Sequence, residues 1–169
     1  MDVLVVDGYN IIGDWDELKR LKDVDLEQAR NRLIEKMAEY KAFSGCRVII
    51  VFDAYYVPGT VNKFREYKVE IIYTKEKETA DERIEKLVKE LKNVVNQVYV
   101  ATSDYAEQRT IFGRGALRKS ARELYIELID MEREIEESVK KHKRVKKHSK
   151  IPLNDDVLEK FEKWRRGNG

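Results

Sequence analysis

The sequence predicts an α/β protein built on a doubly wound parallel sheet of four to five strands, followed by a helical C-terminal extension. Four short apolar runs are rich in Val, Ile and Tyr and are expected to be strands: Val3–Val6, Val48–Phe52, Val69–Tyr73 and Val98–Ala101. They lack a clean alternation of apolar and polar residues, which is typical of parallel strands covered on both faces. Helical patterns lie between these runs, and strands joined through helices by right-handed crossovers form such a sheet.

Two of the helical patterns carry apolar residues at spacings of three or four, which place these residues on one helix face. The apolar positions are Leu26, Ala29, Leu33, Met37 and Tyr40 in the first, and Ile84, Leu87, Val88 and Leu91 in the second. Each helix is therefore expected to pack one apolar face against the sheet.

The last third of the chain has a different pattern. Ser120 and Glu123 have the spacing of a capping box, which predicts the start of a long helix. Its apolar stripe is Ala121, Leu124, Leu128, Ile135 and Val139, and it leads into the basic tract KKHKRVKKHSK at residues 140–150. Beyond Pro152, a final short helix is expected to carry Val157, Leu158, Phe161 and Trp164 on one face. We predict one domain over residues 1–130 and a basic helical extension over 131–169 that packs on it.

Composition excludes several classes of protein. The 34 Lys and Arg nearly balance the 32 Asp and Glu, so net charge does not mark a nucleic-acid binder. The single cysteine, Cys46, excludes an intrachain disulfide and a Cys-based zinc site, and we expect no disulfide-linked partner. No run is long and apolar enough to span a membrane, and the chain starts with a strand-like segment in place of a signal peptide. These observations predict a cytoplasmic protein without a membrane partner.

Acidic residues follow the predicted strands at the points where the strands end. Asp7 closes the first strand, Asp53 the second, and Asp104 follows the fourth, while Asp81 lies at the start of the helix after the third. Because sites in open α/β sheets form beyond the carboxyl ends of the strands, these four carboxylates are expected to converge on one edge.

Such a cluster needs a compensating charge. Two carboxylates about 4 Å apart repel by roughly 4 kcal/mol at an effective dielectric constant of about 20. Either the carboxylates share protons, or a cation lies among them. Oxygen ligands without His or Cys suit Mg²⁺ or Mn²⁺, and such an ion beside a phosphodiester can activate water.

Each residue of this predicted site also has a structural interpretation. Thr79 and Glu82 form a capping box, so acids at residues 81 and 82 also suit a helix N-terminus. Asp104 could cap the next helix, and Asp53 could occupy a turn. Asn10 could orient Asp7 or a water molecule. Thr102 and Ser103 could bind a phosphate or a carboxylate, or cap a helix.

Four segments in this order resemble the NYN branch of the PIN-like nucleases, and within it the bacterial YacP-like proteins. They are Val5-Val6-Asp7-Gly8-Tyr9-Asn10-Ile11-Ile12, Val51-Phe52-Asp53-Ala54, Thr79-Ala80-Asp81-Glu82 and Ala101-Thr102-Ser103-Asp104. A fifth segment, residues 115–124, also resembles the C-terminal block of that family. The resemblance covers residues 3 to 130, most of the chain.

The resemblance implies a PIN-like, flavodoxin-like sheet and a Mg²⁺-dependent endoribonuclease that cleaves mRNA in association with the ribosome. By position, Asp7, Asp81 and Asp104 would be the metal ligands, with Asp53 close by and Glu82 as a further acid. The main alternative is a non-catalytic RNA- or ribosome-binding protein with the same fold, and a metal-dependent phosphohydrolase of small substrates is third.

Basic residues outside the acidic site are candidates for RNA binding. They are Arg114, Arg118, Lys140, Lys141, Lys143, Arg144, Lys146 and Lys147. In the tract at residues 140–150 the acidic residues stop abruptly, which favours contact with RNA or the ribosome. A solvated helix end, where Lys and Arg suit the helix dipole, is the alternative.

Overall fold

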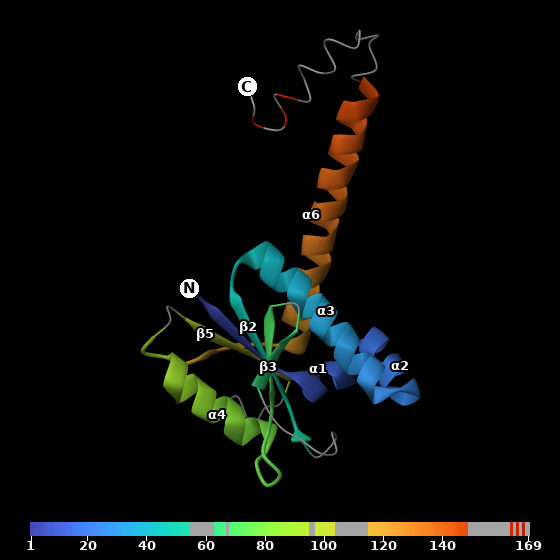
Figure 1. The fold of residues 1–169 in the computed structure, drawn as a ribbon. Coiled ribbons are helices and arrows are strands. Elements are labelled where there is room, and N and C mark those ends of the chain that lie inside the picture. The colour runs from blue at the N-terminus through green and yellow to red at the C-terminus, as the bar shows by residue number, and fades with distance from the viewer. Residues whose placement is uncertain are drawn as a thin grey trace. The chain divides into compact units, whose positions relative to one another are not determined.

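The computed structural model of the protein describes residues 1–54, 63–66, 68–94, 97–103 and 115–148, together with 163, 165 and 167. Side chains are described over the same residues except 63–66, 147 and 148. The chain divides into two compact units, residues 1–131 and 132–169. The sheet and the helices that cover it belong to the first unit (Figure 1).

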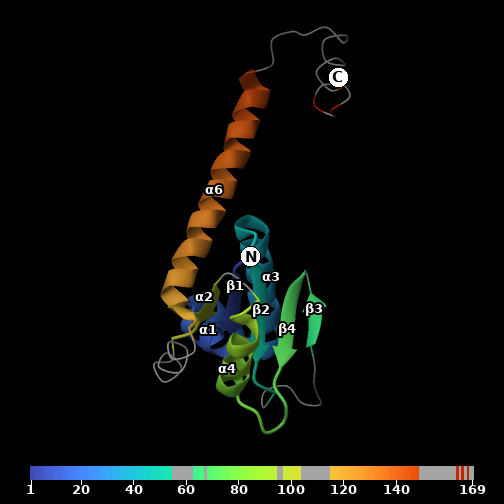
Figure 2. The same cartoon turned by 90° about the vertical axis from the view of Figure 1, so that its left-hand side faces the viewer.

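Six strands form the sheet in the described part of the chain, in the order β3-β4-β2-β1-β5-β6. Their bounds are β1 Val3–Asp7, β2 Arg47–Phe52, β3 Lys63–Glu66, β4 Val69–Tyr73, β5 Val98–Ala101 and β6 Leu117–Lys119. All neighbours pair in parallel except β3, which runs antiparallel to β4 at one edge (Figure 2). The four predicted strands are present, β6 is a fifth parallel strand, and the predicted fold class is confirmed.

The strand order creates a crevice at the centre of the sheet. From β1 the chain first builds outward through β2 and β4, and then returns to the other side of β1 with β5 and β6. Counted along the chain, the parallel strands follow the order 3-2-1-4-5, which differs from the order 2-1-3-4-5 of flavodoxin. The topological switch point, where ligands bind in such sheets, therefore lies between β1 and β5.

Helices cover both faces of the sheet. They are α1 Gly8–Asp14, α2 Asp16–Val24, α3 Leu26–Ser44, α4 Ala80–Leu91 and α6 Ala121–His148. Figure 1 shows α4 on one side of the sheet and α1, α2 and α3 on the other. Because successive side chains of a strand point to opposite faces, Leu4 and Val6 pack with the first three helices, while Val3 and Val5 pack with α4. The fully apolar strands thus reflect two cores, one on each face.

Local signals set the helix boundaries. The Asp25 side chain accepts a hydrogen bond from the Glu27 N–H at the start of α3, and Gly45 ends this helix in the left-handed conformation, with φ of 75°. Thr79 caps α4 through the Glu82 N–H at 3.2 Å, and Ser120 accepts from the Glu123 N–H at 3.0 Å. The predicted caps at Thr79 and Ser120 are confirmed.

Three features differ from the expectation or stay untested. Strands β3 and β6 were not predicted, because both are short and lie at the sheet edges, where no long apolar run is needed. The stripe of α6 is buried only from Ala121 to Leu128, whereas Ile135 and Val139 are 46% and 48% exposed. Pro152 and the expected final helix lie outside the described residues, apart from isolated positions. Packing of residues 131–169 on the first domain stays a prediction.

Among the described helices, we find none with the length and apolar character that a membrane crossing requires.

Gly8 provides a test of the packing behind Asp7. A Cβ atom at this position would overlap the ring of Phe52, which is fully buried, and would lie 3.1 Å from the Val51 carbonyl oxygen. We expect Gly8→Ala to lower the free energy of unfolding by about 1–3 kcal/mol, measured by urea denaturation. Gly13→Ala is the matched control in the same helix, because nothing lies within 4 Å of its added Cβ. This control should leave stability unchanged or raise it by up to about 1 kcal/mol, and equal effects of both changes would contradict the packing argument.

Candidate active site

The carboxyl ends of β1 and β5 lie side by side at the switch point. The register pairs Val6 with Ala101, so Asp7 and Thr102 come next on the two strands. Only 8% of Asp7 is exposed, and Thr102 is fully buried. The structure therefore places the predicted residue Asp7 at the position where a doubly wound sheet binds its ligand.

Asp7 occupies the N-cap position of α1, but its side chain makes no capping hydrogen bond. Helix capping, the usual reason for an aspartate at this position, therefore does not account for it. Gly8, which follows it, lets the backbone pass directly against the Phe52 ring.

Asn10 connects the two sides of the crevice. Its Oδ1 atom accepts a hydrogen bond of 2.6 Å from the Ser103 N–H, across 93 positions of the sequence. Its amide oxygen thus holds the segment that follows β5, and the predicted role of Asn10 in orienting Asp7 or a water molecule stays a prediction. The Thr102 N–H donates to the Lys119 carbonyl at 3.1 Å, which fixes the same segment from the side of β6.

Asp53 is half-buried directly after β2. The neighbouring Ala54 N–H donates to the Thr74 hydroxyl at 2.9 Å, and the Thr74 N–H donates to the Phe52 carbonyl at 3.0 Å. Thr74 is almost fully buried, so it firmly joins the ends of β2 and β4. This arrangement fixes the backbone around Asp53 and makes its position at the sheet edge well defined.

An aromatic group lies beside Asp53. The Tyr9 and Phe52 rings are 5.1 Å apart, and the Phe52 and Tyr73 rings stack at 5.6 Å. Burial raises the pKa of Tyr9, the Arg30 guanidinium opposes this shift, and the negative charge of Asp53 adds to it. The Tyr9 hydroxyl therefore shares its surroundings with both Arg30 and Asp53.

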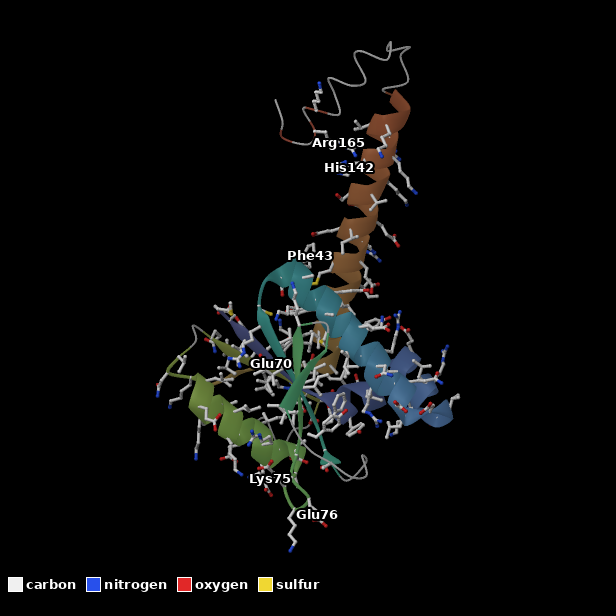
Figure 3. All side chains as sticks on the ribbon, in the orientation of Figure 1. Phe43, Glu70, Lys75, Glu76, His142 and Arg165 are labelled. Carbon is white, nitrogen blue, oxygen red and sulfur yellow. The ribbon has the colours of Figure 1, made fainter. Side chains whose placement is uncertain are left out.

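Asp81 and Glu82 lie in the first turn of α4 and are exposed. The Glu82 N–H is the group that Thr79 caps, so the capping interpretation accounts for the backbone at this position. Lys75 and Glu76 lie in the loop before α4 and point away from the sheet (Figure 3). Because Thr79 caps α4, Asp81 is not needed as the cap, and its role as a metal ligand stays a prediction.

The structure does not gather all the predicted acids into one group. In the part of the chain that it describes, no three of the His, Cys, Asp and Glu side chains lie close enough together to hold a metal ion. Asp104, the predicted third ligand, lies outside the described residues. Asp7, Asn10, Thr102 and Ser103 are brought together at the switch point, and the metal site with Asp53 and Asp81 stays a prediction.

The donor atoms of the described site suit a hard cation. The carboxylates of Asp7 and Asp53 are oxygen donors, and the buried hydroxyl-bearing residues Thr74 and Thr102 lie at the same edge. Cys46 precedes β2 and is therefore at the opposite edge of the sheet. Oxygen donors without sulfur or imidazole fit Mg²⁺ or Mn²⁺ and exclude a zinc site of the Cys type.

Three arginines near the strand ends stand out in the structure. The Arg118 Nε atom donates to the Thr102 carbonyl at 3.3 Å, so this predicted RNA-binding residue lies beside the switch point. The Nε atom of Arg83, in the first turn of α4, is buried and has no hydrogen-bond partner among the described residues. Arg30 binds the Tyr9 hydroxyl. Arg30 and Arg83 were not predicted, because on one sequence they are ordinary charged positions flanking apolar stripes.

The other predicted RNA-binding residues are exposed or outside the description. Arg114 and the side chain of Lys147 are not among the described groups. The exposed ones all lie on α6, around the His142 labelled in Figure 3: Lys140, Lys141, Lys143, Arg144 and Lys146. Exposure fits both a nucleic-acid contact and a solvated helix end, so both interpretations stay open.

Comparison with known proteins identifies the family. Residues 4–166 match the YacP-like NYN domain. The chain belongs to the YacP-like NYN family. It is 57% identical over 168 residues to a protein of Bacillus subtilis (strain 168) named "Uncharacterized protein YacP", and the match covers 99% of each chain. The predicted resemblance is therefore confirmed, and the protein carries a nuclease-like domain.

Solved structures extend the family assignment to the fold. The crystal structure of Rae1 (YacP) from Bacillus subtilis is 57% identical, covers 99% of this chain and 97% of that one, and has a TM-score of 0.76. The crystal structure of a mutant of the same protein is 54% identical, with the same TM-score. The PIN-like character of this YacP-like NYN protein is thus shown by sequence and by structure.

The hydrogen bond between Asn10 and Ser103 gives a prediction for the crevice. Asn10→Ala leaves the Ser103 N–H without its acceptor, and an unsatisfied backbone donor costs about 1–3 kcal/mol when it is buried. We expect urea denaturation to show that Asn10→Ala lowers the free energy of unfolding by about 1 kcal/mol, at the lower end of this range, because Ser103 is only half-buried. Asn31→Ala, on the exposed surface of α3, is the control and should change stability by less than about 0.5 kcal/mol. A neutral Asn10→Ala would show that this bond does not hold the crevice together.

Proposed function

We propose that this protein is a metal-dependent endoribonuclease that cleaves phosphodiester bonds of RNA, with mRNA on the ribosome as its substrate. The observation that carries the proposal is the buried Asp7 carboxylate, which lies at the switch point of a nuclease-like domain and does not cap its helix. A buried carboxylate at the ligand-binding position of a doubly wound sheet is a candidate for catalysis.

In this proposal Asp7, Asp81 and Asp104 hold Mg²⁺ or Mn²⁺, and Asp53 lies beside them. Such a cation, when bound, supplies water activation and neutralises charge on the leaving oxygen. Asn10 positions the segment with Thr102 and Ser103, which leads directly into Asp104. Glu82 adds a second acid at the start of α4.

RNA and the ribosome are the proposed partners, and the cytoplasm is the proposed location. Arg118 supports RNA binding, since its guanidinium lies beside the Thr102 carbonyl at the switch point. The exposed cations of α6 add an electrostatic surface for a phosphate backbone, whose binding free energy is largely electrostatic. Arg114 and Lys147 belong to the same proposal on sequence alone.

The alternative is a non-catalytic RNA- or ribosome-binding protein with the same fold. It would need no metal site, and its basic residues are the same as those of the nuclease proposal. Binding without cleavage would then depend on the basic residues alone, and Asp7 would have no part in activity.

An RNA cleavage assay distinguishes the endoribonuclease from the non-catalytic binding protein. We expect Mg²⁺-dependent RNA cleavage by the wild-type protein, measured on labelled mRNA both free and in a translating cell-free reaction. Asp7→Asn should reduce the cleavage rate at least about a hundredfold, because a carboxylate ligand is replaced by a neutral amide. Asp23→Asn, which changes an exposed acid of α2, should retain full activity. RNA binding without cleavage in both reactions would favour the binding protein.

Thermal unfolding tests the acidic site without a substrate. We expect Mg²⁺ or Mn²⁺ to raise the Tm of the wild-type protein, since a ligand that binds only the folded state stabilises it. Asp7→Asn should have a higher Tm than wild type in EDTA, because one repelling charge is removed, and a smaller response to metal. A lower Tm of the variant in EDTA would contradict a clustered acidic site.

A further inference from the structure

Arg30 differs from Arg32 and Arg47 in what it binds. Its Nη1 atom donates to the Tyr9 hydroxyl at 3.2 Å. By contrast, Arg32 pairs with Glu17 at 2.9 Å, and Arg47 holds both carboxylate oxygens of Glu70. No carboxylate of the described residues forms an ion pair with Arg30, so its charge is not neutralised by direct contact.

Tyr9 fixes the place of this charge at the carboxyl edge of the sheet. Tyr9 is in the first turn of α1, two positions after Asp7, and its ring packs against Phe52 at the end of β2. Both Tyr9 and Arg30 are half-buried, so the guanidinium is held in place and still reachable from solvent. The first turns of α3 thereby bring a cation to the edge where Asp7 and Asp53 lie.

The bond to Tyr9 leaves most of the guanidinium available. Arg carries five N–H donors in a rigid planar fork, and the bond to Tyr9 occupies one of them. The Tyr9 hydroxyl accepts this hydrogen bond and thereby orients the Arg30 guanidinium. A positioned, unneutralised guanidinium beside a carboxylate site is suited to an anion with several oxygen atoms, of which phosphate is the typical case.

We propose that Arg30 binds a phosphate group of the RNA strand next to the one that is cleaved, and that Tyr9 is the positioning residue that aims it. This proposal rests on the proposed function and adds a specific contact to it. The competing role is a counter-charge: Arg30 would then only offset the negative charge of Asp53, without touching RNA.

Salt-dependent RNA binding distinguishes these roles. The probe is a short, fluorescein-labelled single-stranded RNA of mixed sequence, and binding is measured by anisotropy in EDTA over a series of KCl concentrations. For each phosphate contact, the slope of log K against log salt changes by about 0.7 for a single strand. We expect Arg30→Gln to weaken binding about tenfold and to make the slope shallower by about 0.7.

Three further variants make the test specific. Tyr9→Phe should weaken binding a few-fold at an unchanged slope, because the charge remains and only its orientation is lost. Arg30→Lys should restore the wild-type slope but only part of the affinity, since a lysine keeps the charge without the planar fork. Arg32→Gln is the matched control on the same helix, in which the lost cation is one already paired with Glu17 and Glu35. It should bind like wild type.

Two results would overturn the proposal. If Arg30→Gln and Arg32→Gln have the same slope and affinity, Arg30 does not contact RNA, while Asp7-dependent cleavage by the wild type would still uphold the proposed function. If Arg30→Gln changes only the response of Tm to Mg²⁺, Arg30 is a counter-charge. Failure of the wild type to bind or cleave RNA, free or on ribosomes, would remove the proposed function and this inference together. Arg30→Lys and Tyr9→Phe carry the test if Arg30→Gln does not fold.

Discussion

Burial of β1 on both faces is the constraint on which the rest of the structure depends. This strand pairs in parallel with β2 on one side and β5 on the other, and all five of its residues are buried. A strand in this position has to be apolar along its length, and its first charged side chain can appear only where it leaves the sheet. Asp7 is at that point. The same constraint produces the two cores, because alternate residues of β1 contact the helices of opposite faces.

Hydrogen bonds from backbone N–H groups fix the chain at the switch point between β1 and β5. The segment after β5 is bound by the Asn10 amide oxygen on one side and by the Lys119 carbonyl on the other. The ends of β2 and β4 are joined in a similar way through Thr74. These bonds fix the backbone at Ala54, Thr102 and Ser103, and a site whose ligands come from several strands requires such fixed positions.

Charge is distributed unevenly around this edge. The carboxylates of Asp7 and Asp53 lie at the strand ends, while Arg30, Arg83 and Arg118 approach from a helix on each face and from β6. Arg83 has a buried donor without a partner among the described residues, and a buried unsatisfied donor is unfavourable unless an acceptor can reach it. Carboxylates and guanidinium groups at the same edge of the sheet would suit the phosphodiester of the proposed RNA substrate, whose negative oxygens guanidinium groups bind well.

The sequence by itself determined the class of the sheet, the four central strands, the caps at Thr79 and Ser120 and the family. These features follow from local composition and short-range spacing, or from motifs that are contiguous in the chain. The position of Asp7 at the sheet edge was also predictable, because a parallel strand places its carboxyl end there. Only the tertiary structure decided the partners of Asn10 and Arg30, because a hydrogen bond across 93 positions leaves no trace in one sequence. It also decided how far the stripe of α6 is buried, since periodicity shows which face of a helix is apolar and not what covers that face.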